Sequence, residues 1–211
     1  MSIFTGIPMA AVEFYAALEK NNNKEWWLGH KDIYDAAVRA PLLGLQQAAE
    51  GKFGSGKIFR PYRDVRFSPD KSPYKIAQGM FVSNYEEVGF YVQIDADGLL
   101  VGGGYHSSSP AQLSRYRAAV DSSASGAALE TILKGLGSAG LTLEGQTLKR
   151  VPQGFAKDHP RAELLKHKTV SASKHLGTPL WLETAQAEQE ILSSWEQLRP
   201  LVDWVIRYAA P

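Results

Sequence analysis

The sequence predicts a single α+β domain, in which a mostly antiparallel sheet packs against N- and C-terminal helices. Apolar residues recur at helical spacing before Gly51 and again from Glu183 to Tyr208. Between these stretches, short β-rich runs follow one another, and two of them flank a strong turn sequence. No repeat, low-complexity tract or linker divides the 211 residues. We expect the sheet to occupy residues 58–105 and 141–176.

The N-terminal region predicts two helical stretches. Pro8 suits the first turn of a helix, where its missing N–H costs nothing, and this helix should stop at Asn21-Asn22-Asn23. A second stretch begins near Glu25 or His30 and continues to Gly51. Pro41 is a candidate break in it, because proline cannot donate the helical hydrogen bond.

The middle of the chain predicts strands. Asp95-Ala96-Asp97-Gly98 has strong turn chemistry, so the runs on either side read as an antiparallel hairpin. Gly102-Gly103-Gly104 weakens the second of these strands, which indicates that the backbone bends there or approaches something closely. The expected strands are Arg63–Phe67, Lys75–Val82, Val88–Ile94 and Leu99–Tyr105.

The C-terminal half alternates between helices and short strands. Ser109-Pro110-Ala111-Gln112 combines a serine cap, a proline at the first helical position and a glutamine that can complete a capping box. The other expected elements are a helix over Gly126–Leu136, a strand or hairpin over Leu141–Val151, a short helix from Pro160, a strand over Val170–Leu176, and a long helix over Glu183–Tyr208 that kinks near Pro200.

Composition narrows the function classes. The net charge is only +1, which argues against a protein whose whole surface is basic and binds long nucleic acid. A local basic site is still compatible with this charge. Cysteine is absent, so disulfides, thiolate metal sites and cysteine nucleophiles are excluded; this fits a reducing cytoplasm. We expect no signal peptide and no membrane span, because no long apolar run occurs. The histidine spacing predicts no metal site.

One segment has an unusual excess of positive charge: Arg60–Lys75, with the sequence RPYRDVRFSPDKSPYK. It holds five cations and two acids, a local net charge of +3, whereas an ordinary solvated face mixes its signs better. Tyr62, Phe67 and Tyr74 lie among the charges. Arginine offers a planar fork of donors for phosphate or carboxylate, and lysine adds a point charge.

Four segments together resemble a known family. Asn21–Trp27 resembles its NNxxWF-like signature, and Tyr62–Lys75 resembles its YRDxRFSxDKxPYK motif. Tyr91–Gly104 is similar to its YYxxI…GGG hairpin, and Pro152–Pro160 is similar to its PRGF…DHP segment, with Gln153 in place of the arginine. The family is the bacterial and fungal domain of unknown function numbered 2461. The resemblance spans nearly the whole chain, and it implies a domain boundary but no activity or cofactor.

The leading functional hypothesis is a pocket for a small anionic, phosphorylated ligand. Gly103 and Gly104, which lead into a helix start, are candidates for a second half of the same site. Asp64 and His106 are candidate catalytic acids or bases, and no metal ligands are assigned. The remaining candidate ligand-binding residues are Arg63, Arg66, Ser68, Lys71, Lys75 and Arg115.

Two alternatives remain open. In an extended segment Arg63 and Arg66 face opposite sides, so they can instead form internal ion pairs that hold a loop in place. The basic segment and its aromatic residues can also form an exposed platform for nucleic acid or a protein partner. A concave charged cleft favours the ligand pocket, whereas an open basic face favours the binding module.

Overall fold

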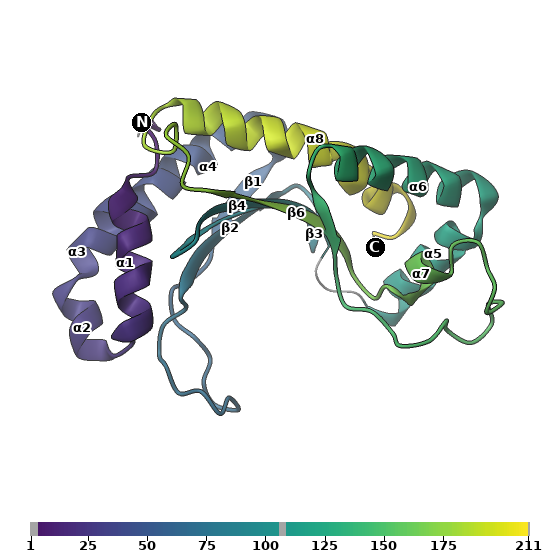
Figure 1. The fold of residues 1–211 in the computed structure, drawn as a ribbon, viewed down its shortest axis with the longest axis horizontal. Coiled ribbons are helices and arrows are strands. Elements are labelled where there is room, and N and C mark those ends of the chain that lie inside the picture. Colours follow the sequence, from purple (N-terminus) through teal and green to yellow (C-terminus); the bar gives the residue numbers. More distant parts are fainter. Residues whose placement is uncertain (1–3, 106–108, 211) are drawn as a thin grey trace. The chain divides into compact units, whose positions relative to one another are not determined.

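The structure is a computed structural model that describes residues 4–105 and 109–210 (Figure 1). It confirms the predicted α+β class, with a six-stranded antiparallel sheet in the order β1-β2-β3-β4-β6-β5. The strands are β1 (Ser55–Ile58), β2 (Ala77–Ser83), β3 (Val88–Asp95), β4 (Gly98–Tyr105), β5 (Thr142–Glu144) and β6 (Val170–Gly177). The helices are α1 (Met9–Lys20), α2 (Lys24–Gly29), α3 (Lys31–Ile33), the π-helix η1 (Tyr34–Arg39), α4 (Ala40–Phe53), α5 (Pro110–Asp121), α6 (Ser123–Ser138), α7 (Ala162–Lys166) and α8 (Gln186–Tyr208).

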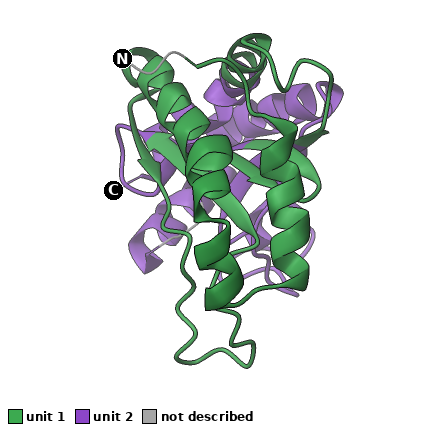
Figure 2. Cartoon of the chain, turned by 90° about the vertical axis from the view of Figure 1, so that its left-hand side faces the viewer, with its two compact units in different colours: residues 1–82, 91–101, 175–193 green, residues 83–90, 102–174, 194–211 purple. Residues whose placement is uncertain are grey.

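The chain divides into two compact units (Figure 2). Unit 1 contains residues 1–82, 91–101 and 175–193, and unit 2 contains residues 83–90, 102–174 and 194–211. Strands β2, β3, β4 and β6 and helix α8 each contribute residues to both units. The single domain inferred from the sequence stays a prediction.

In unit 1, the first helix begins and ends where its sequence signals predict. Pro8 is the N-cap of α1, and Asn21 is its C-cap. The next helix, α2, is capped by Asn23, whose side chain accepts a 3.0 Å hydrogen bond from the Trp26 N–H. The apolar face of α1 is buried, with Val12, Phe14, Tyr15 and Leu18 inside.

The helical stretch was expected to break at Pro41, and this prediction is wrong, because the helix does not end there. The helix continues through it, but the six residues before α4 adopt a π-helix, in which the Ala40 N–H bonds to the Asp35 carbonyl five residues earlier. Pro41 has no N–H, and in an α-helix its ring would collide with the carbonyl of Ala37. One extra residue in the turn relieves this collision without ending the helix.

The predicted hairpin is confirmed as β3 and β4, which are joined by Ala96-Asp97. The Asp97 N–H donates to the Asp95 carboxylate at 2.9 Å, and Gly98 adopts a φ of 104° that favours glycine. Alternate residues of β3 are buried, as the period of two requires: Phe90, Val92 and Ile94 lie inside, whereas Tyr91 and Gln93 are half-buried.

Two strand predictions need correction. Arg63–Phe67 is not a strand but part of a loop between β1 and β2, residues 59–76, which we call the central loop. Its three prolines cannot donate ladder hydrogen bonds, so pairing is limited to one isolated bridge between Tyr62 and Tyr74. The strand expected over Leu141–Val151 ends at Glu144, because Gly145 takes a φ of 133°.

In unit 2, the glycines of β4 allow close packing. A Cβ atom on Gly103 would lie 3.2 Å from the Leu198 side chain and 3.3 Å from Val202, both on α8. Gly104 has a φ of 132°, and a Cβ atom there would lie 2.3 Å from the Val170 carbonyl oxygen of β6. The predicted close approach at these glycines is therefore an approach of the protein to itself.

Further predictions for the C-terminal half are confirmed. Ser109 and Gln112 form the predicted capping box at the start of α5. The strand expected over Val170–Leu176 is β6, and the long C-terminal helix is α8, with Pro200 in its interior. Within the described residues, no helix combines the length and apolar character needed to cross a bilayer.

Candidate functional site

The base of the central loop is closed by backbone pairing. Tyr62 and Tyr74 form an antiparallel bridge, flanked by backbone hydrogen bonds of 2.9 Å from Arg63 to Pro73 and 2.8 Å from Lys75 to Pro61. Figure 1 shows the loop between β1 and β2 extending away from the strands of unit 1. The two ends of the charged motif therefore lie side by side, and its middle forms the tip.

The N-terminal asparagine motif holds this base. Asn22 binds the main chain of Tyr74 with both ends of its amide: its Nδ2 donates to the carbonyl at 2.9 Å, and its Oδ1 accepts the N–H at 3.1 Å. The Trp27 ring stacks on the Tyr74 ring at 4.1 Å between centroids and 8° between planes. Trp27 and Tyr74 are buried, so the loop base is part of the core of unit 1.

Two arginines of the motif are paired with carboxylates inside the loop. Arg66 binds Asp64 through two hydrogen bonds, Nε to Oδ1 at 3.0 Å and Nη2 to Oδ2 at 2.7 Å. Arg63 pairs with Asp70, whose other oxygen accepts hydrogen bonds from the Ser72 N–H and hydroxyl. This is the internal pairing that the alternation of the motif allowed.

These pairs fix the protonation of both carboxyl groups. The hydrogen bonds from Arg66 lower the pKa of Asp64, with a smaller contribution from the charge of Arg60. The hydrogen bond from the Ser72 side chain, followed by that from Arg63, lowers the pKa of Asp70. A carboxylate held ionised in this way is a weak proton acceptor, so the geometry favours a structural role for the predicted catalytic Asp64.

The remaining loop candidates have different surroundings. Lys71 donates from its ammonium group to the Val65 carbonyl at 3.0 Å, and Ser68 is half-buried in the turn. Lys75 lies with its ammonium 5.4 Å from the centroid of the Phe59 ring. Burial and, secondly, the charge of Arg60 lower the pKa of Lys75. These two cations therefore repel each other.

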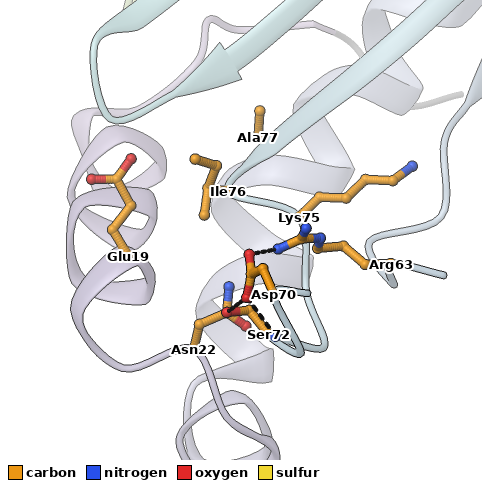
Figure 3. A pocket seen from close by; sticks show the side chains of 8 residues that line it. All are labelled: Glu19, Asn22, Arg63, Asp70, Ser72, Lys75, Ile76 and Ala77. Carbon is orange, nitrogen blue, oxygen red and sulfur yellow. Dashed lines mark hydrogen bonds and ion pairs between the residues drawn. The ribbon is translucent and has the colours of Figure 1, made fainter. Parts of the chain in front are cut away.

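One pocket of about 600 Å³ lies against the loop base (Figure 3), and we call it the loop pocket. Arg63 and Lys75 supply two positive groups to its wall, but Glu19 and Asp70 supply two negative ones. In Figure 3, Arg63 points to Asp70, whereas Lys75 extends away from it. The lining residues are Glu19, Asn22, Arg63, Asp70, Ser72, Lys75, Ile76 and Ala77. The balance of charges makes this wall a poor match for an anion.

A second hollow of about 450 Å³, which we call the basic groove, has a different charge. Three cations line it, Arg39, Lys57 and Arg60, and no acid is among the described residues of its wall. Across the described ranges, none of the three forms an ion pair with a carboxylate. The lining residues are Tyr34, Arg39, Leu43, Gln46, Lys57, Ile58, Phe59, Arg60 and Pro61.

The π-helix supplies both of its end residues to this groove. Tyr34 opens η1 and Arg39 closes it, and both line the hollow. Tyr34 donates from its hydroxyl to Gln78 Oε1 at 2.7 Å, and burial raises the pKa of Tyr34 to about 12. The phenol therefore remains a neutral wall of the groove. π-Helical turns occur frequently at functional sites.

Sequence reasoning missed most of the groove. Arg60 belongs to the charged motif, but Arg39 comes from a helix and Lys57 from β1. No spacing in the sequence links these residues, and only the fold brings them together. The one available signal is Pro41, because a proline inside a helical pattern indicates irregular backbone at the preceding turn.

The other predicted site residues belong to unit 2, and the charged motif belongs to unit 1. Gly103 and Gly104 contact α8 and β6, as described above. Arg115 is exposed on α5 and donates to the Ala209 carbonyl at 3.5 Å. His106 lies outside the described residues. The second half of one site, predicted from these residues, therefore stays a prediction.

Neither a search for metal ligands nor the comparison with known proteins assigns a function to the site. Among the side chains that the structure describes, no three His, Asp or Glu residues gather as metal ligands would. The model of one protein family, described as a conserved hypothetical protein (DUF2461), matches residues 10–204. No curated protein matches the sequence.

Proposed function

Because the chain belongs to the conserved hypothetical protein family DUF2461, whose description names no activity, we propose a function from the geometry alone: binding of a small anionic molecule in the basic groove. A phosphoryl or carboxylate group is the chemistry that suits it. Arg39 and Arg60 each offer a planar fork of N–H donors, and Lys57 adds a point charge.

One observation carries this proposal: three cations line one hollow without an acid in its described wall. Cations that share a hollow repel one another, and the repulsion weakens when an anion binds between them. The charge of Arg60 also helps, after burial, to lower the pKa of Lys75, a cation outside the described groove wall. A volume of about 450 Å³ is in the range of small-molecule sites.

The loop pocket supports such a ligand less well, although it contains Arg63 and Lys75 from the predicted set. Arg63 is already paired with Asp70, and an entering anion would also meet Glu19. An anion would have to displace an existing ion pair there, whereas the basic groove offers cations that no described carboxylate neutralises.

Pyrophosphate titrated by isothermal calorimetry at low salt tests the proposal. We expect saturable binding by the wild-type protein, weakened about tenfold or more by Arg39→Ala or Arg60→Ala, since a charge-assisted hydrogen bond contributes about 1.5–3 kcal/mol. Arg150→Ala is the matched control, because this exposed arginine lies in unit 2 and its loss changes the net charge equally. Equal affinities in all four proteins would remove the basic groove as the site.

A further inference from the structure

We propose that the tip of the central loop is a second, separate binding site, and that its ligand is single-stranded nucleic acid. The tip is centred on Phe67 and Arg66, and it carries Lys71 on its returning limb. None of these three residues lines the basic groove or the loop pocket. The inference therefore does not depend on the small-anion site.

Phe67 is the observation that points to a ligand. Its side chain is 95% exposed, although aromatic residues elsewhere in unit 1, such as Trp27 and Tyr74, are buried. Within the described residues, the group that approaches its ring is the Arg66 guanidinium, 5.9 Å from the centroid. An exposed ring offers a π face on which a nucleobase can stack, whatever the base.

The loop holds this ring on an ordered support. The Lys71 ammonium binds the Val65 carbonyl across the tip, and Asp70 is bound by both Arg63 and Ser72. With the closed base, these bonds limit the number of conformations that the tip can adopt in the free protein. A preorganised loop loses less conformational entropy when it binds than a flexible loop does.

Charge matches the tip to a polyanion. The stretch Arg60–Lys75 has five cations against two acids, and each of the two acids is already bound by an arginine of the same loop. Lys71 has a carbonyl rather than a carboxylate as its partner among the described residues. Arg60 lines the basic groove and Lys75 the loop pocket, so Lys71 is the cation of the tip that no described carboxylate neutralises. A phosphate backbone beside the ring can reach it.

Tyr62, at the base of the same loop, is a second exposed aromatic ring. Tyr62 is 50% exposed, and its ring packs against Tyr74 at 5.3 Å and Trp27 at 6.4 Å between centroids, which fixes its orientation. Two exposed aromatic rings interleaved with cations are the combination that binds single strands without sequence preference. Double-stranded nucleic acid offers no free base face to such rings.

The composition of the tip favours nucleic acid over an anionic membrane. Insertion of Phe67 into a bilayer would also carry the neighbouring Arg66–Asp64 ion pair out of water, which is costly. One phenylalanine provides little apolar area to offset that cost. Stacking on a base leaves the same ion pair in solvent.

Fluorescence anisotropy with a labelled oligothymidylate tests the inference. We expect binding that weakens with added salt, with a slope of log K against log salt of about −0.7 for each phosphate contact. Phe67→Ala should weaken binding by about fivefold or more, because stacking on one ring has that effect, whereas Phe67→Tyr should retain it. Lys71→Ala should reduce both the affinity and the salt slope.

The matched control is Tyr85→Ala. Tyr85 is also an exposed aromatic residue, at 52%, but it lies beside Glu86 and Glu87 instead of cations. We expect this variant to bind the oligonucleotide as the wild type does. Pyrophosphate binding should be the same in Phe67→Ala and wild-type protein, which separates this site from the basic groove.

Three results would overturn the inference. The first is no binding at low salt, and the second is a Phe67→Ala variant that binds as tightly as the wild type. The third is binding to phosphatidylserine vesicles, lost in Phe67→Ala, without binding to the oligonucleotide. That result would assign the tip to a membrane surface instead.

Discussion

The side-chain amide of Asn22 forms a pair of hydrogen bonds with the main chain of Tyr74. The pair resembles the one that a neighbouring strand would form. The amide donates to the Tyr74 carbonyl at 2.9 Å and accepts its N–H at 3.1 Å. The two residues are 52 positions apart, and each belongs to one of the segments that resemble the family. The N-terminal signature therefore acts as a support for the central loop.

Asn22→Asp tests this support. The aspartate keeps an acceptor for the Tyr74 N–H but places a charged oxygen against the Tyr74 carbonyl. We expect the free energy of unfolding, measured by urea denaturation, to fall by about 1–3 kcal/mol. Asn21→Ala is the control, since among the described residues the Asn21 side-chain amide donates to the Ala17 carbonyl of its own helix. Equal losses in both variants would contradict a special role for Asn22.

Gly104 tests the packing explanation of the three glycines. Gly104→Ala places a methyl group 2.3 Å from the Val170 carbonyl oxygen at a φ of 132°, and we expect it to destabilise unit 2 by about 3 kcal/mol or more. Gly135→Ala, in open space on α6, should instead stabilise by about 0.5–1 kcal/mol. Thermal unfolding checks both signs. A neutral Gly104→Ala variant would mean that the backbone there is free to move.

Local signals predicted the fold well where side chains and main chain act within a few residues. The capping box at Ser109, the Asp95–Gly98 turn and the periodicity of α8 are signals of this kind. The strand expected at Arg63–Phe67 failed because it would have needed a neighbouring strand as a partner. Proline-rich sequence on both limbs allows only the Tyr62–Tyr74 bridge.

Pro41→Ala tests whether the π-helix positions Arg39. The substitution restores an N–H that can bond to the Ala37 carbonyl, so the segment can return to α-helical register. This would turn Arg39 by about 100° around the helix axis. We expect pyrophosphate affinity to fall about tenfold, because the Arg39 guanidinium would leave the groove. Unchanged affinity would show that the π-helix is irrelevant to the groove.

His167 predicts how stability depends on pH. Burial lowers its pKa from the usual 6.5, although the Thr169 carbonyl and Glu163 act in the opposite direction. Between the two pKa values the unfolded chain binds more protons than the folded one, so stability is complete above about pH 6.5 and is lost as pH falls below it. Urea denaturation at pH 7.5 and pH 5.5 should show a smaller difference for His167→Gln than for the wild type. An equal difference would contradict the assignment.

The candidate site was less predictable than the fold because its charges depend on tertiary neighbours. From sequence, the five cations of Arg60–Lys75 looked short of counterions. The folded loop pairs Arg63 and Arg66 with its own two acids, and the fold instead gathers Arg60 with Arg39 and Lys57. Charge composition predicted an anionic ligand, whereas only the folded structure shows which cations lack a carboxylate partner among the described residues.

Anomalous diffraction from crystals soaked in sodium tungstate, a heavy analogue of phosphate, tests the basic groove most directly. We predict an anomalous peak within hydrogen-bond distance of Arg39 and Arg60, beside Lys57, that is absent from crystals of the Arg39→Ala variant. A peak in the loop pocket beside Arg63 instead, or an empty groove at saturating tungstate, would contradict the proposal.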